Sequence, residues 1–200
     1  MNVSRLLNFD NSKVWIVGSE GAVGQYVASS FAQVGASIVA DAKKFTNQYT
    51  ALESAVNSEG QYFSAFSRDE MCHMFSSHTK DSKSNILIIN MNCLGEKSMD
   101  IVDQLTSAFI NVSKGKVILI QHGEDRSIFQ NQINNIADVI EPNNGTINGI
   151  HFTELSSNNG NTRVSLSSIG DTCVIATGNS SNPLSRTIFT FLENWDCNNY

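Results

Sequence analysis

The sequence is poor in the residues that mark several classes of protein. Its 200 residues include only two prolines and four cysteines, and the cysteines and four histidines form no Cys-x-x-Cys pair and no other ligand-spaced set. The sequence therefore predicts neither a metal site nor a disulfide framework. Thiols scattered in this way are typical of proteins from reducing compartments, and we expect a cytoplasmic location.

Positive charge and long apolar runs are also scarce. The chain has 13 basic and 19 acidic residues, a net charge of -6 and an isoelectric point near 5.1. A net negative charge repels nucleic acid and anionic lipid, which bind to positively charged surfaces. No apolar stretch reaches the roughly 18–20 residues that span a bilayer. We therefore expect neither nucleic acid nor a membrane as a partner.

The chain does contain enough apolar material for a core. Hydrophobic residues make up 40% of it and charged residues 16%, which is typical of a globular protein. The length suits one compact domain, and no repeat or low-complexity linker divides it. We expect residues 1–200 to form a single domain.

Short apolar runs alternate with segments of helical spacing, which is the pattern of a parallel sheet covered by helices. The predicted strands are Val14–Val17, Ser37–Ala40, Tyr62–Phe66, Ile86–Asn90, Val117–Gln121, Ile147–His151 and Cys173–Ala176. The predicted helices are Val23–Val34, Thr46–Val56, Arg68–Ser76, Met99–Val112, Ser127–Val139 and Leu184–Trp195. The predicted fold class is α/β: a single doubly wound, mostly parallel Rossmann-type sheet of about seven strands with helices on both faces.

A glycine-rich turn joins the first predicted strand to the first predicted helix. Gly18 permits a tight turn, Gly21 lets the backbone approach a pyrophosphate, and Gly24 lets the helix pack closely on the strand. The helix start would direct free amides and its positive dipole end at phosphate. The candidate cofactor-binding residues of this turn are Gly18, Ser19, Glu20, Gly21, Ala22, Val23 and Gly24. A turn whose glycines serve only packing is the alternative.

A carboxylate follows the second predicted strand. Asp41 lies 23 residues beyond Gly18, where a carboxylate can accept hydrogen bonds from the ribose of adenosine. The strand, the glycine turn, the helix and this acidic residue together predict a dinucleotide-binding domain.

These pieces resemble the short-chain dehydrogenase/reductase family. The resemblance is carried by Gly18–Gly24, Asp41, Ser64–Glu70, Asn85–Asn92, Gly115–Ile120 and Ile147–Ile150. It implies an oxidoreductase-related protein that binds a nicotinamide dinucleotide, with a small carbonyl or alcohol as substrate. The family places the adenine beside the end of the third strand, here Phe66 and Ser67, and the cofactor ribose beside the end of the fourth, here Asn90, Met91 and Asn92. For Asn90 and Asn92, capping of the strand end is the alternative.

The charges near the adenosine ribose favour NAD(H) over NADP(H). Glu20 and Asp41 would repel the additional 2′-phosphate of NADP. Lys43 and Lys44 are close enough in sequence to offset that repulsion. The balance of these charges predicts NAD(H) as the preferred cofactor.

The catalytic pattern of the family is incomplete in this chain. Family reductases use a serine at the end of the fifth strand and a later Tyr-x-x-x-Lys, whose lysine lowers the pKa of the tyrosine. No lysine follows Lys116, and the only tyrosine in the second half of the chain is Tyr200. The serine position falls at or beside His122, whose imidazole can exchange a proton near neutral pH. We expect its sequence neighbours Glu124 and Asp125 to orient the ring. His122 is the candidate catalytic residue, and an ordinary polar loop residue is the alternative.

Two main interpretations of the function remain. One is a divergent NAD(P)-binding oxidoreductase with atypical catalytic residues. The other is a non-catalytic Rossmann protein, either a cofactor-sensing regulator or the inactive partner of an active reductase. A homo- or hetero-oligomer is compatible with both interpretations. A turn that holds another nucleotide, or none, is the third possibility. The polar segment Ser156–Asn161 is a candidate substrate-side loop, with an ordinary surface turn as its alternative.

Overall fold

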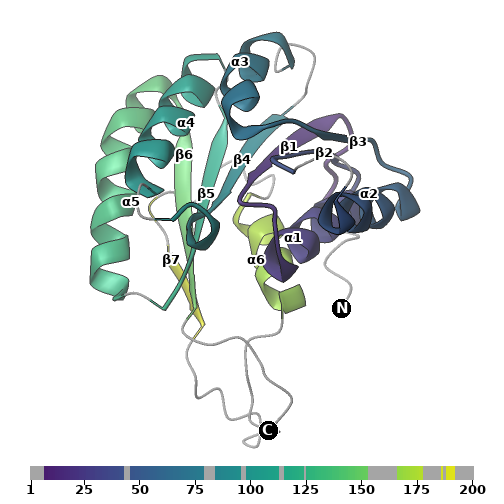
Figure 1. Ribbon diagram of the computed structural model, residues 1–200. Coiled ribbons are helices and arrows are strands. Elements are labelled where there is room, and N and C mark those ends of the chain that lie inside the picture. Colours follow the sequence, from purple (N-terminus) through teal and green to yellow (C-terminus); the bar gives the residue numbers. More distant parts are fainter. Residues whose placement is uncertain are drawn as a thin grey trace, which may run out of the picture.

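A sheet of parallel strands with helices on both faces makes up the fold (Figure 1). The computed structural model describes residues 7–42, 46–78, 84–95, 98–112, 115–123, 125–152, 166–177, 186 and 188–191. Within these residues the strands are β1 (Ser12–Val17), β2 (Ser37–Ala40), β3 (Phe63–Ala65), β4 (Ser84–Asn90), β5 (Lys116–His122), β6 (Thr146–Phe152) and β7 (Ile188–Phe191). Their order is β3-β2-β1-β4-β5-β6-β7, and every neighbouring pair is parallel. The predicted α/β class and doubly wound sheet are confirmed.

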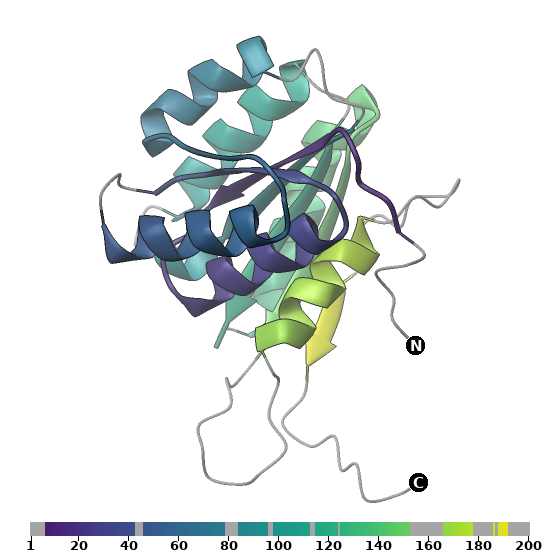
Figure 2. The same ribbon diagram turned by 90° about the vertical axis from the view of Figure 1, so that its right-hand side faces the viewer.

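The helices form one layer on each face of the sheet (Figure 2). They are α1 (Ala22–Gln33), α2 (Asn47–Ser58), α3 (Arg68–His78), α4 (Ser98–Val112), α5 (Arg126–Ile140) and α6 (Leu166–Ala176), with short 3-10 turns at η2 (Met91–Cys93) and η3 (Glu141–Asn143). Buried side chains from α1, α2 and α6 join one hydrophobic core, and those from α3, α4 and α5 join the other. Within the described residues, no helix is both long and apolar enough to cross a membrane.

Alternating side chains of the central strands supply both cores. In β1, Val14 and Ile16 belong to the core under α1, while Trp15 and Val17 belong to the core under α3. All four side chains are almost completely buried. Successive residues of a strand point to opposite faces, so a sheet covered on both sides needs an unbroken apolar run of this kind.

Two predicted elements near the C-terminus are wrong. The segment Cys173–Ala176, predicted as a strand, forms the last turn of α6, and the last strand is Ile188–Phe191, inside the predicted helix Leu184–Trp195. A four-residue apolar run cannot by itself distinguish a buried strand from a buried helix. The β-branched and aromatic residues of Ile188–Phe191 instead suit a strand. The bounds of the other predicted strands and helices agree with the structure to within two residues at each end.

Candidate functional site

The predicted cofactor-binding residues gather at one edge of the sheet. Parallel strands all end at the same edge. The glycine turn follows β1, Asp41 follows β2, and Phe66 and Ser67 follow β3. Asn90 is the last residue of β4, with Met91 and Asn92 directly after it, and His122 is the last residue of β5. The strand order reverses between the neighbours β1 and β4. Ligands of open α/β sheets bind at such a reversal, outside the carboxyl ends of the strands.

Two glycines let the turn pack tightly. Gly18 has a φ of 72°, and a Cβ there would lie 2.5 Å from the backbone oxygen of Asn90. A Cβ on Gly24 would lie 2.6 Å from the carbonyl carbon of Ser19. Both distances are shorter than real Cβ contacts, so any side chain would displace backbone. Packing therefore accounts for these two glycines, as the sequence predicted for Gly24.

Gly21 has a different environment. Its φ is 99°, and a Cβ there would meet nothing within 4 Å. It is the N-cap of α1 and gives that helix no side-chain cap, whereas Thr46 caps α2 and Asp125 caps α5. Gly21 and its neighbours Glu20 and Ala22 are exposed, so the start of α1 is open to solvent at this point. An uncapped helix start beside an open glycine has the room and the donors that a phosphate group needs.

Asp41 is tied to the glycine turn by several hydrogen bonds. Its carboxylate accepts from the backbone N–H of Gly18 and of Ser19, each at 2.9 Å, and the hydroxyl of Ser19 donates to its backbone oxygen at 3.1 Å. The side chain of Asp41 is only 5% exposed. Its contact with a ribose stays a prediction, but its role in shaping the turn is visible directly.

Arg68, the first residue of α3, also binds this carboxylate. Its Nε and Nη2 donate to one Asp41 oxygen at 3.3 and 3.1 Å. Arg68 was not a candidate from the sequence alone, because only the parallel pairing of β2 with β3 brings the two strand ends together. The available signal was a basic residue at the start of a predicted helix, two positions after a predicted strand.

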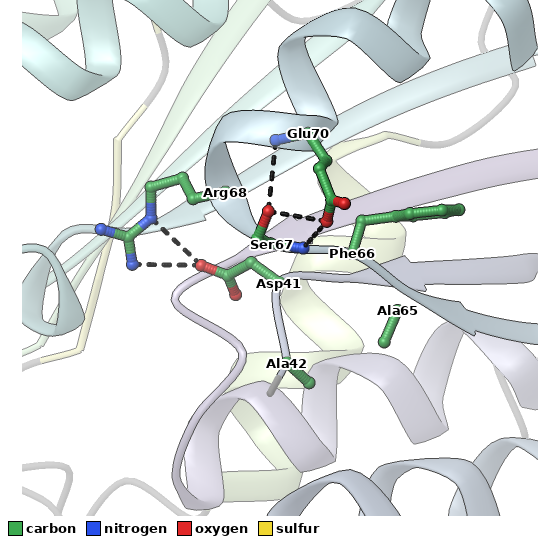
Figure 3. Close-up of a pocket in the computed structure, with 7 residues that line it drawn as sticks. All are labelled: Asp41, Ala42, Ala65, Phe66, Ser67, Arg68 and Glu70. Carbon is green, nitrogen blue, oxygen red and sulfur yellow. Dashed lines mark hydrogen bonds and ion pairs between the residues drawn. The ribbon is translucent and has the colours of Figure 1, made fainter. Parts of the chain in front are cut away.

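A cavity of about 410 Å³ opens beside this ion pair (Figure 3). Its lining residues are Asp41, Ala42, Ala65, Phe66, Ser67, Arg68 and Glu70. Ser67 and Glu70 form a capping box at the start of α3, in which the Ser67 N–H and hydroxyl donate to Glu70 at 2.7 and 2.6 Å. The cavity thus combines apolar walls with a guanidinium, and it includes Phe66 and Ser67, the residues predicted to border an adenine.

The asparagines that end β4 connect neighbouring segments of this edge. Asn90 is buried, and its Nδ2 donates to the backbone oxygen of Gly18 at 3.2 Å. Asn92 is exposed; its amide donates to the His122 oxygen at 3.1 Å and accepts the His122 N–H at 2.8 Å. Met91 is buried in the core under α3. Asn90 and Asn92 thus hold the turn and the end of β5, and contact with a cofactor stays a prediction.

Cys93 lies between the glycine turn and β4. Its thiol donates to the backbone oxygen of Glu20 at 3.3 Å, and its sulfur lies 3.2 Å from Nδ2 of Asn90. Burial raises the pKa of this thiol, and the negative charges of Asp41 and Glu20 add to the effect. The thiol is therefore kept in its neutral form, in which it can donate this bond.

His122 lies at the carboxyl end of β5 with its side chain half-buried. Its ring packs against Phe152 of β6, with centroids 5.0 Å apart. Asp125 does not orient it, because Asp125 accepts a hydrogen bond from the Ser127 N–H at 2.7 Å and caps α5. Hydrogen bonding to Ser127 lowers the pKa of Asp125, so that the cap is charged at neutral pH.

Some predicted residues lie outside the part of the chain that the structure describes. They are Lys43 and Lys44, Glu124, the loop Ser156–Asn161 and Tyr200. The helix after β5 is α5, which begins at Arg126 and ends at Ile140, and it contains neither tyrosine nor lysine. The family's Tyr-x-x-x-Lys therefore has no counterpart on this helix.

Neither a protein-family model nor a curated protein matches the sequence. Solved structures do match the fold. A short-chain dehydrogenase/reductase from Serratia marcescens aligns over 92% of this chain and 97% of its own, with 12% identity and a TM-score of 0.74. An NADH-dependent reductase complexed with NAD aligns over 94% and 96%, with 13% identity and a TM-score of 0.72. A hydroxysteroid dehydrogenase from Escherichia coli aligns over 94% and 98%, with 15% identity and a TM-score of 0.71. The chain therefore has the Rossmann-like fold of short-chain dehydrogenases/reductases in a divergent form.

Proposed function

We propose that this chain binds a nicotinamide dinucleotide across the carboxyl edge of its sheet. The observation that carries the proposal is the open, uncapped start of α1 at Gly21, located where the strand order reverses. The cavity beside Phe66 gives an adenine apolar walls at the end of β3. The solved structures with the same fold include a reductase complexed with NAD, which supports this ligand class.

Different residues of this edge would contact different parts of the cofactor. The amides at the start of α1 would hold the pyrophosphate, and Phe66 and Ser67 would border the adenine. Asn90 is bonded to the glycine turn and Asn92 to the end of β5, and both would border the cofactor ribose. A nicotinamide dinucleotide supplies hydride transfer when bound. His122, at the end of β5, is the group we assign to proton transfer with a small carbonyl or alcohol.

The first test is the substitution Gly21→Val. We expect it to weaken binding of NAD at least tenfold, because a side chain there fills the space over the first amides of α1 and strains a left-handed backbone. Isothermal titration calorimetry measures the affinity.

Gly60→Val is the matched control. Gly60 also has a positive φ, 74°, with no atom within 4 Å of an added Cβ. It lies between α2 and β3, at the opposite edge of the sheet, so it carries similar strain without touching the site. Equal loss of affinity in both variants would assign the effect to strain alone. The proposal fails if the unmodified chain shows neither heat nor a thermal shift with millimolar NAD or NADP.

The second prediction is that NAD binds about tenfold more tightly than NADP. Glu20 is exposed on the turn, and Asp41 accepts a hydrogen bond from the N–H of the preceding residue, Ser19. Each like-charge contact with a 2′-phosphate at a partly exposed site costs on the order of 1 kcal/mol. Titration with both dinucleotides measures the ratio, which Glu20→Gln should reduce. Tighter binding of NADP would contradict the prediction.

The second candidate function is that of a non-catalytic dinucleotide-binding protein. The absence of tyrosine and lysine from α5 favours it, since the family's proton donor has no counterpart there. Such a protein would act as a cofactor sensor or as the inactive partner of an active reductase. It binds the dinucleotide as proposed above and shows no turnover by itself.

A further inference from the structure

We propose that Arg68 is a specificity-determining residue that limits how strongly this site discriminates against NADP. The inference rests on the proposed function, because it concerns the adenosine end of the same dinucleotide. The placement of Arg68 against a buried carboxylate at the rim of a cavity carries it.

The carboxylate of Asp41 has little capacity left for a ligand. Two backbone N–H groups and two guanidinium N–H groups already donate to its two oxygens. Its side chain is 5% exposed, whereas that of Arg68 is 34% exposed. Both side chains line the cavity, and the guanidinium is the more exposed of the two charged groups (Figure 3).

The guanidinium retains hydrogen-bonding capacity after pairing with Asp41. Arginine has five N–H donors, and the Asp41 contacts use one on Nε and one on Nη2. The other donors can bind a phosphate in the planar, two-pronged manner typical of arginine. The pair as a whole is neutral, so Asp41 repels a 2′-phosphate much less than a free carboxylate would. The remaining discrimination against NADP is then left to Glu20 on the turn and to Glu70, which also lines the cavity.

The test measures the ratio of the NADP and NAD dissociation constants in a set of charge variants. Arg68→Gln removes the cation and leaves the carboxylate, so we expect the ratio to rise about tenfold as NADP weakens. Arg68→Lys keeps the charge and should stay within about threefold of the unmodified ratio. Asp69→Asn is the control, because Asp69 is exposed on the next residue of α3 and does not line the cavity.

A second pair of variants avoids a buried unpaired carboxylate, which can destabilise the fold in Arg68→Gln. Asp41→Asn keeps the cation alone, and Asp41→Asn with Arg68→Gln removes both charges. We expect the single variant to bind NADP at least tenfold more tightly than the double variant. If both dinucleotides bind and neither comparison changes the ratio, the role of Arg68 is wrong while the proposed function stands. If neither dinucleotide binds to the unmodified chain, the proposed function fails and this inference fails with it.

Discussion

We expect any carbonyl reduction by this chain to fall about 10²–10⁴-fold in His122→Ala. The fold positions a single imidazole at the end of β5, where the family places a serine, and the tyrosine and lysine of the family have no counterpart on α5. Proton transfer by a positioned side chain contributes rate factors of this size. Two hydrogen bonds between the Asn92 side chain and the His122 backbone, one donated by each residue, hold the strand end, so removing the imidazole leaves it in place. Steady-state turnover of a panel of ketones with NADH measures the effect.

His73→Ala is the matched control for this loss. His73 is exposed on α3 and lies away from the carboxyl ends of the strands. It should leave both turnover and NAD affinity unchanged. Rapid turnover by the His122→Ala variant would contradict the assignment and show that the active site lies elsewhere. Turnover that appears only after a second protein is added would support the inactive-partner interpretation instead.

The largest expected effect on stability is that of Trp15→Ala. Trp15 is fully buried in β1, and its ring packs edge-on against Phe75 of α3 with centroids 4.9 Å apart. Removing a buried tryptophan loses its transfer free energy and leaves a cavity, which typically costs about 3–5 kcal/mol. Urea denaturation measures the free energy of unfolding.

Tyr62→Ala provides the comparison for Trp15→Ala. Tyr62 is also aromatic but is 68% exposed at the start of β3, so its loss should change the unfolding free energy by less than about 0.5 kcal/mol. A loss below about 1 kcal/mol in Trp15→Ala would show that the core under α3 is less well packed than the structure indicates.

The first half of the fold was readable from local signals. Strand β1, the glycine turn and α1 follow one another within a few residues, and each has its own pattern: an apolar run, spaced glycines and helical periodicity. Such signals depend on neighbouring residues only, so a single sequence contains them. The parallel sheet then followed from the alternation of strands and helices.

Contacts between distant residues could not be read in the same way. The pairing of Arg68 with Asp41 spans 27 residues and depends on the order of strands in the sheet. The prediction that Asp125 orients His122 was wrong for a related reason. Asp125 is a good N-cap, and the local bond to Ser127 satisfies it. The segment Cys173–Ala176 is apolar because it packs inside a core, a property that strands and helices share.

The packing of α6 on α1 has a consequence for the nascent chain. Gly170 lets the two helices approach so closely that an added Cβ would lie 2.8 Å from the backbone oxygen of Tyr26. The two helices lie side by side (Figure 2), and both contribute side chains to the same hydrophobic core. Ribosomes add roughly 5–20 residues per second, so about 7–30 seconds pass between the synthesis of α1 and the completion of α6. During most of the time that synthesis takes, α6 is therefore not available to cover the apolar flank of α1, which water or a chaperone can reach instead.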